Sequence, residues 1–314
     1  MLSHKGECCV IARIFAVTVV AAAFAWAAEG PNGATPEAPT FHADGKLVLV
    51  PVTVMDRGGA IVNGLASDAF TLTEDGVRQP VRSFSEEESP VSMGIVLDVS
   101  GSMARVLETA KESLKTLLKD ANPDDEVFVN GVSTRPRTYS GFTDGFDDIV
   151  RRIAYEHADG STALIDTIYG SMQELRGGAH PRKALVVISD GMDNHSRYTS
   201  RELQRLAVET DAQVYAIAVS GGAPRTKGVD YALEMGGLSF LNELASKTGG
   251  ISFVVRNGTD IAKATFTIGR ALRNQYLIGY MPGDSRGNGQ WRKIAVKVAG
   301  QGLRAYARTG YRPD

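Results

Sequence analysis

The chain has 314 residues, 43% of them hydrophobic, so it is long enough to bury the core of one large domain or of two modest ones. Its 34 basic and 36 acidic residues nearly balance and give a formal net charge of −2. Because there is neither a basic surplus nor a long acidic tail, the composition argues against nucleic acid as a partner.

The N-terminus differs from the rest of the chain. Lys5 and Arg13 precede an apolar run of about fourteen residues, "IFAVTVVAAAFAWA", and Ala25-Trp26-Ala27 fits the small-x-small cleavage pattern. We therefore interpret residues 1–27 as a secretory signal peptide, which predicts an exported protein, periplasmic or secreted. An uncleaved membrane anchor is the alternative, but the run is short for crossing a bilayer. We expect no membrane span in the mature chain.

Both cysteines, Cys8 and Cys9, precede this apolar run. A lipoprotein cysteine would follow the run, so we expect no lipid anchor. The mature chain then contains no cysteine, and its exported fold is predicted to stand without disulfides.

The segments before residue 91 are predicted to be a lead-in and a small β region. Residues 28–40 are rich in Pro, Gly and Ala and are predicted to be flexible. Residues 41–88 contain the β-branched run "KLVLVPVTVMD" and a hairpin signal at Asp75-Gly76. The region is predicted to end in a charged linker, "SEEESP".

Residues 91–274 alternate between apolar strands and amphipathic helices. The strand "VSMGIVLDVS" is followed by a helical stripe in "ARVLETAKESLKTLLKDA", and "DEVFVNGVS", "KALVVISDG", "AQVYAIAVS" and "ISFVV" are predicted to be further strands. This alternation predicts an α/β fold with a doubly wound, mainly parallel sheet and helices on both faces.

Two local predictions inside this region concern helix starts. Ser200 is predicted to cap the helix in "SRELQRLAVETD". Residues 221–238 are predicted to be a Gly-rich loop that leads to the helix in "SFLNELASKTGG".

After residue 274 the pattern returns to β alternation. Residues 275–314 are predicted to pack with 41–88 as a small β platform.

Oxygen-bearing side chains follow three of the predicted elements. Asp98, Ser100 and Ser102 stand at the end of the first core strand, Thr162 where a loop enters a helix, and Asp190 at the end of the strand "VVIS". Ligands of open α/β sheets bind outside the carboxyl ends of the strands, and hard divalent cations prefer oxygen ligands. These five residues therefore predict a site for Mg²⁺, or for Mn²⁺ or Ca²⁺ in its place.

Simpler interpretations exist for single members of this set and for their neighbours. Asp98 and Ser100 alone are typical of a helix N-cap, and only Thr162 and Asp190 favour the metal site. Three further groups are predicted to have supporting or no roles. They are Asp166 on a solvated helix face or as an acceptor behind the ligands, Asp193 and Asn194 in a polar loop at the rim, and the exposed His157, His180 and His195.

The D-x-S-x-S pattern at Asp98, with the later Thr162 and the S-D-G around Asp190, resembles the metal-ion-dependent adhesion site of von Willebrand factor type A domains. The resemblance covers roughly residues 91–274 and implies a Rossmann-like fold. It also implies that the serines and Thr162 coordinate a metal through hydroxyls, and the carboxylates directly or through water. The flanking β segments resemble the exported bacterial group of von Willebrand factor A-related proteins, abundant in Acidobacteria.

The resemblance implies an exported, divalent-cation-dependent, adhesion-like binding module. A protein partner would complete the bound metal with an Asp or Glu carboxylate. The alternative is a structural envelope or assembly protein with a non-essential metal site.

An enzyme such as a metal-dependent hydrolase is disfavoured. Ser100 occupies the place of the second Asp that a haloacid-dehalogenase-like phosphatase needs. "GDSRG" at 283–287 matches G-x-S-x-G, but it lies between two β runs instead of at a strand–turn–helix junction. We therefore expect no catalytic residues.

Overall fold

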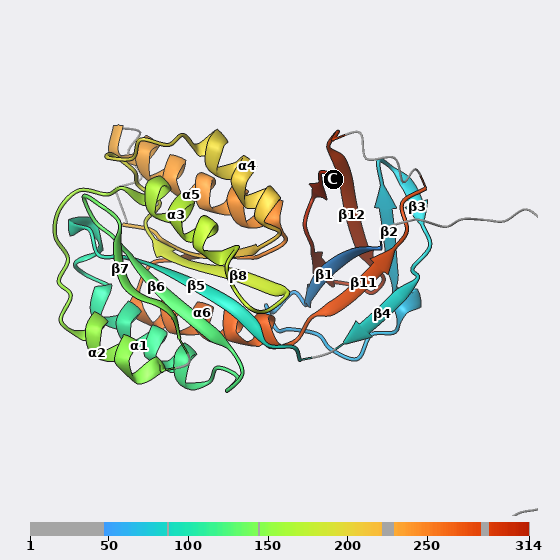
Figure 1. Ribbon diagram of the computed structural model, residues 1–314, viewed down its shortest axis with the longest axis horizontal. Helices are drawn as coiled ribbons and strands as arrows, with labels where there is room; N and C mark the ends of the chain where they lie inside the picture. The colour runs from blue at the N-terminus through green and yellow to red at the C-terminus, as the bar shows by residue number, and fades with distance from the viewer. Residues whose placement is uncertain (1–46, 87, 144, 222–228, 284–288, 314) are drawn as a thin grey trace, which may run out of the picture. The chain divides into compact units, whose positions relative to one another are not determined.

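A six-stranded sheet forms the centre of the α/β region in this computed structural model (Figure 1). The strand order is β10-β9-β8-β5-β6-β7, and every pair is parallel except β6–β7. The strands are β5 (Val91–Asp98), β6 (Glu126–Val132), β7 (Arg137–Thr143), β8 (Arg182–Ser189), β9 (Gln213–Val219) and β10 (Ser252–Val255).

The structure describes residues 47–86, 88–143, 145–221, 229–283 and 289–313, all of which belong to one compact unit. The predicted signal peptide (1–27), the predicted lead-in (28–40), residues 41–46 of the predicted β segment and most of "GDSRG" lie outside these ranges. Within them, every helix is too short or too polar to span a lipid bilayer.

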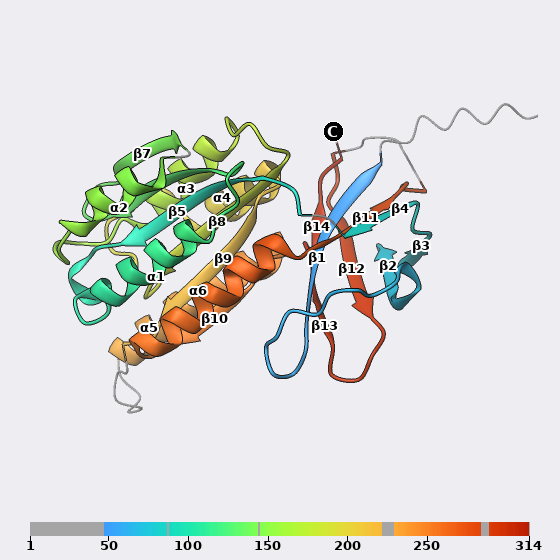
Figure 2. The same cartoon turned by 90° about the horizontal axis from the view of Figure 1, so that it is seen from below.

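Helices cover both faces of the sheet (Figures 1 and 2). Met93, Ile95 and Leu97 of β5 pack with α1, α2 and α6 in one buried cluster, while Val96 packs with α3, α4 and α5 in another. The predicted doubly wound α/β fold is thus confirmed. The helices are α1 (Leu107–Lys119), α2 (Phe146–Ala154), α3 (Leu164–Leu175), α4 (Ser200–Thr210), α5 (Val229–Thr248) and α6 (Gly258–Arg273).

The winding of the chain changes direction at β5. The chain runs from β5 to β6 on one side, and after β7 it returns to β8 on the other side of β5. The helices that follow the two central strands lie on opposite faces, α1 after β5 and α4 after β8. The loops after these strands therefore diverge, and such a switch point is where open α/β sheets bind their ligands.

The structure departs from the sequence prediction at α5. This helix begins at Val229, so residues 229–238 are helical and do not belong to a loop. Gly236 and Gly237 suggested a loop because glycine disfavours helices. Gly237 is instead needed for a close backbone contact with Gly191, which is described below.

The cap of α4 also differs from the prediction. Thr199, one residue before Ser200, is the N-cap: its Oγ1 accepts the Glu202 N–H at 3.3 Å, and Glu202 Oε2 accepts the Thr199 N–H at 2.7 Å. This is a reciprocal capping box, which satisfies two backbone donors that the helix itself leaves unpaired.

Thr199→Ala is therefore expected to lower the free energy of unfolding by about 1 kcal/mol, because it removes the capping oxygen. The matched control is Ser200→Ala, one residue later, which removes no capping bond. It should change the free energy of unfolding by only a small fraction of that amount. Urea unfolding of both variants provides the measurement. Equal losses would show that Thr199 does not cap the helix.

Segments from before and after the α/β region pair with each other in two four-stranded sheets that enclose one hydrophobic cluster (Figure 2). The sheet orders are β13-β1-β11-β4 and β14-β12-β2-β3, so both contain early and late strands. The strands are β1 (Val48–Met55), β2 (Phe70–Glu74), β3 (Val77–Gln79), β4 (Ser83–Glu86), β11 (Tyr276–Tyr280), β12 (Arg292–Val298), β13 (Arg304–Tyr306) and β14 (Gly310–Tyr311).

Two details of this region bear on the sequence predictions. Asp75 (φ 48°) and Gly76 (φ 84°) form the tight turn between β2 and β3, as their dipeptide predicts. The start of "SEEESP" is strand and not linker, because β4 pairs with β11 and Glu86 accepts the Gly64 N–H. Its charged residues suggested a linker, although the segment begins in a strand whose pairing partner lies far along the chain.

Candidate metal centre

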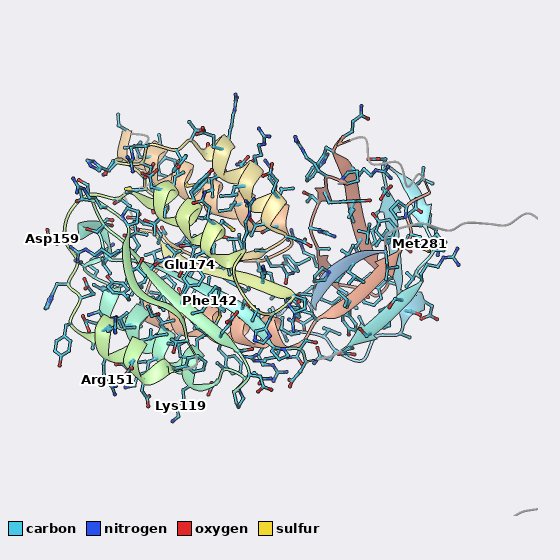
Figure 3. The ribbon with its side chains drawn as sticks, in the orientation of Figure 1. Lys119, Phe142, Arg151, Asp159, Glu174 and Met281 are labelled. Carbon is cyan, nitrogen blue, oxygen red and sulfur yellow. The ribbon has the colours of Figure 1, made fainter. Side chains whose placement is uncertain are left out.

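Three loops meet beyond the carboxyl ends of β5 and β8. The Asp159 N–H donates to Val99 O at 2.9 Å, which places the loop before α3 beside the end of β5; Figure 3 labels Asp159 in this loop. The Asn194 N–H donates to Thr162 O at 3.0 Å and joins the same loop to the one after β8. All three stretches that carry the predicted ligands are thus tied together by backbone hydrogen bonds.

Asp98 is fully buried at the end of β5. Its Oδ1 accepts the backbone N–H of Ser100 at 2.9 Å, and its Oδ2 accepts the Ser189 hydroxyl at 2.6 Å. A carboxylate oxygen can accept more than one bond, so both oxygens keep acceptor capacity. The two hydrogen bonds fix the plane of the carboxylate.

The predicted hydroxyl ligands come from two loops. A 3₁₀ turn at Gly101–Met103 follows Ser100, and the Ser100 and Ser102 Oγ atoms lie 3.1 Å apart. Ser100 is buried, whereas Ser102 is exposed. Thr162 is buried, and both its backbone N–H and its carbonyl are bonded to the loop after β8. Within the described ranges, no protein hydrogen bond occupies the Thr162 hydroxyl.

Asp190 follows β8 directly and is also buried. Its Oδ1 accepts the Met192 N–H at 3.0 Å. The pKa of Asp98 is raised to about 6, mainly by burial and to a smaller extent by the negative charge of Asp190, while hydrogen bonds from Ser100 and Ser189 act in the opposite direction. The two carboxylates are therefore close enough to repel each other.

The charges and donor types of this cluster fit a hard divalent cation. Among the residues that the structure describes, neither Asp98 nor Asp190 forms an ion pair with a basic side chain, and buried carboxylates without a cation are costly. The described residues contain no group of three His, Cys, Asp or Glu side chains at one point. The predicted set needs only two carboxylates and takes its other oxygens from hydroxyls, which suits Mg²⁺.

Comparison with protein families identifies the domain that carries this cluster. Residues 93–192 match the family model of the von Willebrand factor type A domain. This part of the chain is therefore similar to a type A domain. All five predicted ligands, Asp98, Ser100, Ser102, Thr162 and Asp190, lie within the matched residues. No curated protein sequence matches the chain at a significant level.

The chain is also similar to several solved structures, at low sequence identity. The vWF domain of the type V pili tip protein Mfa5 from Porphyromonas gingivalis is 13% identical, with a TM-score of 0.49 over 59% of this chain and 95% of that one. A von Willebrand factor type A protein from Catenulispora acidiphila is 12% identical, with a TM-score of 0.48 over 87% and 76% of the chains. The pilus adhesin SpaC from Lactobacillus rhamnosus GG is 8% identical, with a TM-score of 0.49 over 80% and 49%.

Several residues outside the predicted set hold the predicted ligands in place, and the sequence analysis gave one of them, Ser189, no role. Ser189 donates to Asp98 and accepts the Gly191 N–H at 3.0 Å. Asn194 Oδ1 accepts the Thr162 N–H at 2.9 Å, and Asp193 Oδ1 accepts the Leu164 N–H at 3.0 Å, so this loop holds the start of α3. The one available signal was Ser189 itself, a polar residue at the end of a buried strand.

Asp166 proves to be buried, and its role is that of an acceptor behind the predicted ligands. Its Oδ1 accepts the N–H groups of Arg197 and Tyr198, each at 2.9 Å. It therefore fixes the loop after β8 against α3. His157 and His195 are exposed and His180 is half-buried, so only the last departs from the predicted exposure.

A backbone contact ties the Asp190 loop to α5. Gly191 has φ +77°, and a Cβ at Gly237 would lie 2.7 Å from the Gly191 carbonyl carbon and 2.9 Å from Asp190 O. Only glycine permits this approach at either position. The contact explains Gly237 inside α5 and makes the helix a support for the Asp190 loop.

Proposed function

We propose that this chain is an exported protein-binding module of the adhesion type, and that its binding depends on a divalent cation. The proposed metal-ion-dependent adhesion site consists of Asp98, Ser100, Ser102, Thr162 and Asp190. The main support is the buried position of Asp98 next to the charge of Asp190, with no basic side chain among the described residues to neutralise them. Such a pair is strongly favourable only with a cation.

The donor set also supports a binding role that is completed from outside. Two carboxylates and three neutral hydroxyls provide fewer donors than an octahedral ion accepts. A bound Mg²⁺ or Mn²⁺ would supply a positively charged coordination position for an anionic oxygen. The exposure of Ser102, a member of the proposed set, supports a coordination position that a partner can reach. The fitting partner is a protein that presents an Asp or Glu carboxylate.

The proposal assigns no catalytic role to this site. Nucleophilic use of Ser100 or Ser102 would require a base within hydrogen-bond distance. In the part of the chain that the structure describes, neither hydroxyl is hydrogen-bonded to a histidine or lysine, and the two hydroxyl oxygens lie 3.1 Å from each other. Export rests on the predicted signal peptide at residues 1–27 alone.

The test uses the immobilised full chain with envelope and culture fractions, in Mg²⁺ or in EDTA, with the captured protein identified and then purified. We expect the purified partner to bind in Mg²⁺ and to be released by EDTA. Substitution of its critical carboxylate by Asn or Gln should weaken binding by at least about 2 kcal/mol, the scale for losing a buried charged contact. The control is Asp159→Asn, an exposed carboxylate at the same edge, which should bind normally.

Undiminished binding in EDTA would contradict the proposed mechanism. It would favour the structural alternative, in which the protein assembles into the envelope and its metal site is not needed. Turnover of a phosphate or ester substrate would instead favour the enzyme alternative.

A further inference from the structure

A hollow lies beside the candidate metal centre, between the β6–β7 turn and the loop after β8. We call it the Arg135–Arg197 hollow; its volume is about 450 Å³. It is lined by Thr134, Arg135, Pro136, Asp166, His195 and Arg197.

The hollow adjoins Thr162 on both sides. On one side, the His195 N–H donates to Thr162 O at 3.1 Å. On the other, Thr134 Oγ1 accepts the Ser161 N–H at 3.2 Å. The walls of the hollow are thus hydrogen-bonded to a predicted metal ligand and to its neighbour. A ligand segment at the metal site would pass directly by this hollow.

The hollow carries positive charge. Arg135 is exposed and forms no ion pair with the residues that the structure describes, and the Arg197 side chain is 91% exposed. The only carboxylate of the lining is Asp166, which is buried. Asp166 Oδ1 is occupied by two backbone N–H groups, and Arg197 Nε lies 3.6 Å from its Oδ2. Two arginines and one largely satisfied carboxylate therefore line the hollow.

A second hollow, on the other side of the β6–β7 turn, lacks this positive charge. It is also lined by Arg135, but there Arg137 Nη1 is paired with Glu156 Oε2 at 3.1 Å, and Asp159 adds a further negative charge. Its charges nearly cancel. The positive charge is thus concentrated on the side of Thr162 where Arg197 lies.

From this placement we infer that the Arg135–Arg197 hollow binds a second acidic side chain of the partner, close to the carboxylate that completes the metal. The inference rests on the proposed function. The partner is then a protein segment with two nearby Asp or Glu residues. A planar guanidinium matches a carboxylate in charge and geometry. The net charge of −2 for the whole chain favours this short-range contact over attraction of an extended polyanion.

The test titrates synthetic glycine-flanked peptides into the full chain in saturating Mg²⁺, followed by NMR or fluorescence. One peptide has a single aspartate; the others have a second aspartate directly beside the first or separated from it by glycine. We expect the best two-aspartate peptide to bind about fivefold more tightly than the single one, the scale of an exposed charge pair. In the double variant Arg135→Gln/Arg197→Gln this preference should disappear.

The variant should still bind Mg²⁺ and the single-aspartate peptide, because neither arginine belongs to the predicted ligands. The control is Arg78→Gln, which removes an exposed arginine of β3 and should keep the preference. A preference that persists in the double variant would overturn the inference but leave the proposed function intact. If no peptide binds in a Mg²⁺-dependent manner, the proposed function fails, and the inference fails with it.

Discussion

Asp98→Asn is expected to abolish Mg²⁺ and Mn²⁺ binding and, at the same time, to stabilise the metal-free protein at neutral pH. The variant removes one of the two negative charges of the proposed site. It keeps a side chain of the same shape that can still bond to Ser189 and to the Ser100 N–H. Calorimetric titration of both ions into the two proteins measures the first effect. Equal heats would place the metal elsewhere.

The stabilisation follows from the raised pKa of Asp98, about 6 against an ordinary value of 3.8. The folded state holds this proton more tightly than the unfolded state. The stabilisation that comes from this tighter proton binding is therefore complete below about pH 4 and is lost as the pH rises through about 6. At neutral pH the ionised carboxylate costs the metal-free fold about 3 kcal/mol. Asparagine does not titrate, so it should recover much of this free energy.

Urea unfolding in EDTA across this pH range measures the effect. Because Asp98 loses its proton in this range, the free energy of unfolding of the wild-type protein should fall between about pH 4 and neutral. The free energy of unfolding of Asp98→Asn should fall less. The matched control is Asp159→Asn, which changes an exposed carboxylate of the same edge and should follow the wild-type profile. Parallel profiles for Asp98→Asn and wild type would contradict the assigned cause. Added Mg²⁺ should stabilise the wild type and leave the variant unchanged.

Gly237→Ala is expected to weaken metal binding by about 10- to 100-fold, although the residue is no ligand. Its methyl group would lie 2.7 Å from the Gly191 carbonyl carbon and 2.9 Å from Asp190 O, both of them backbone atoms. The backbone must therefore shift, and Asp190 shifts with it. Overpacking of this kind also lowers the free energy of unfolding, by about 1–3 kcal/mol.

Gly236→Ala is the matched control, since the neighbouring residue of the same helix has nothing within 4 Å of the added Cβ. Alanine favours helix over glycine, so this variant should gain up to about 1 kcal/mol and bind the metal as the wild type does. Calorimetry with Mn²⁺ and urea unfolding separate the two outcomes. If both variants bind equally well, α5 does not support the Asp190 loop.

The sequence alone was sufficient for the α/β order and for the choice of candidate ligands, because both depend on local patterns. Continuous apolar runs indicate strands that are buried on both faces, as in β5 and β8. Apolar residues that recur with a period of about 3.6 indicate the helices between them. Parallel strands align their carboxyl ends, so oxygen side chains that follow several strands are predicted to converge before any contact is known. Asp75-Gly76 predicted its turn for a similarly local reason, the tolerance of positive φ.

Only the tertiary structure decided what holds these side chains in place. Ser189 reaches Asp98 over 91 residues of chain, Asn194 holds Thr162, and Gly237 meets Gly191 backbone to backbone. It likewise decided that β4 is a strand, since its partner β11 lies nearly two hundred residues further along the chain. It also brought Arg135 and Arg197 into one hollow. Propensity and periodicity describe the neighbourhood of each residue along the chain, whereas close approach and net charge at a site depend on residues that only folding brings together.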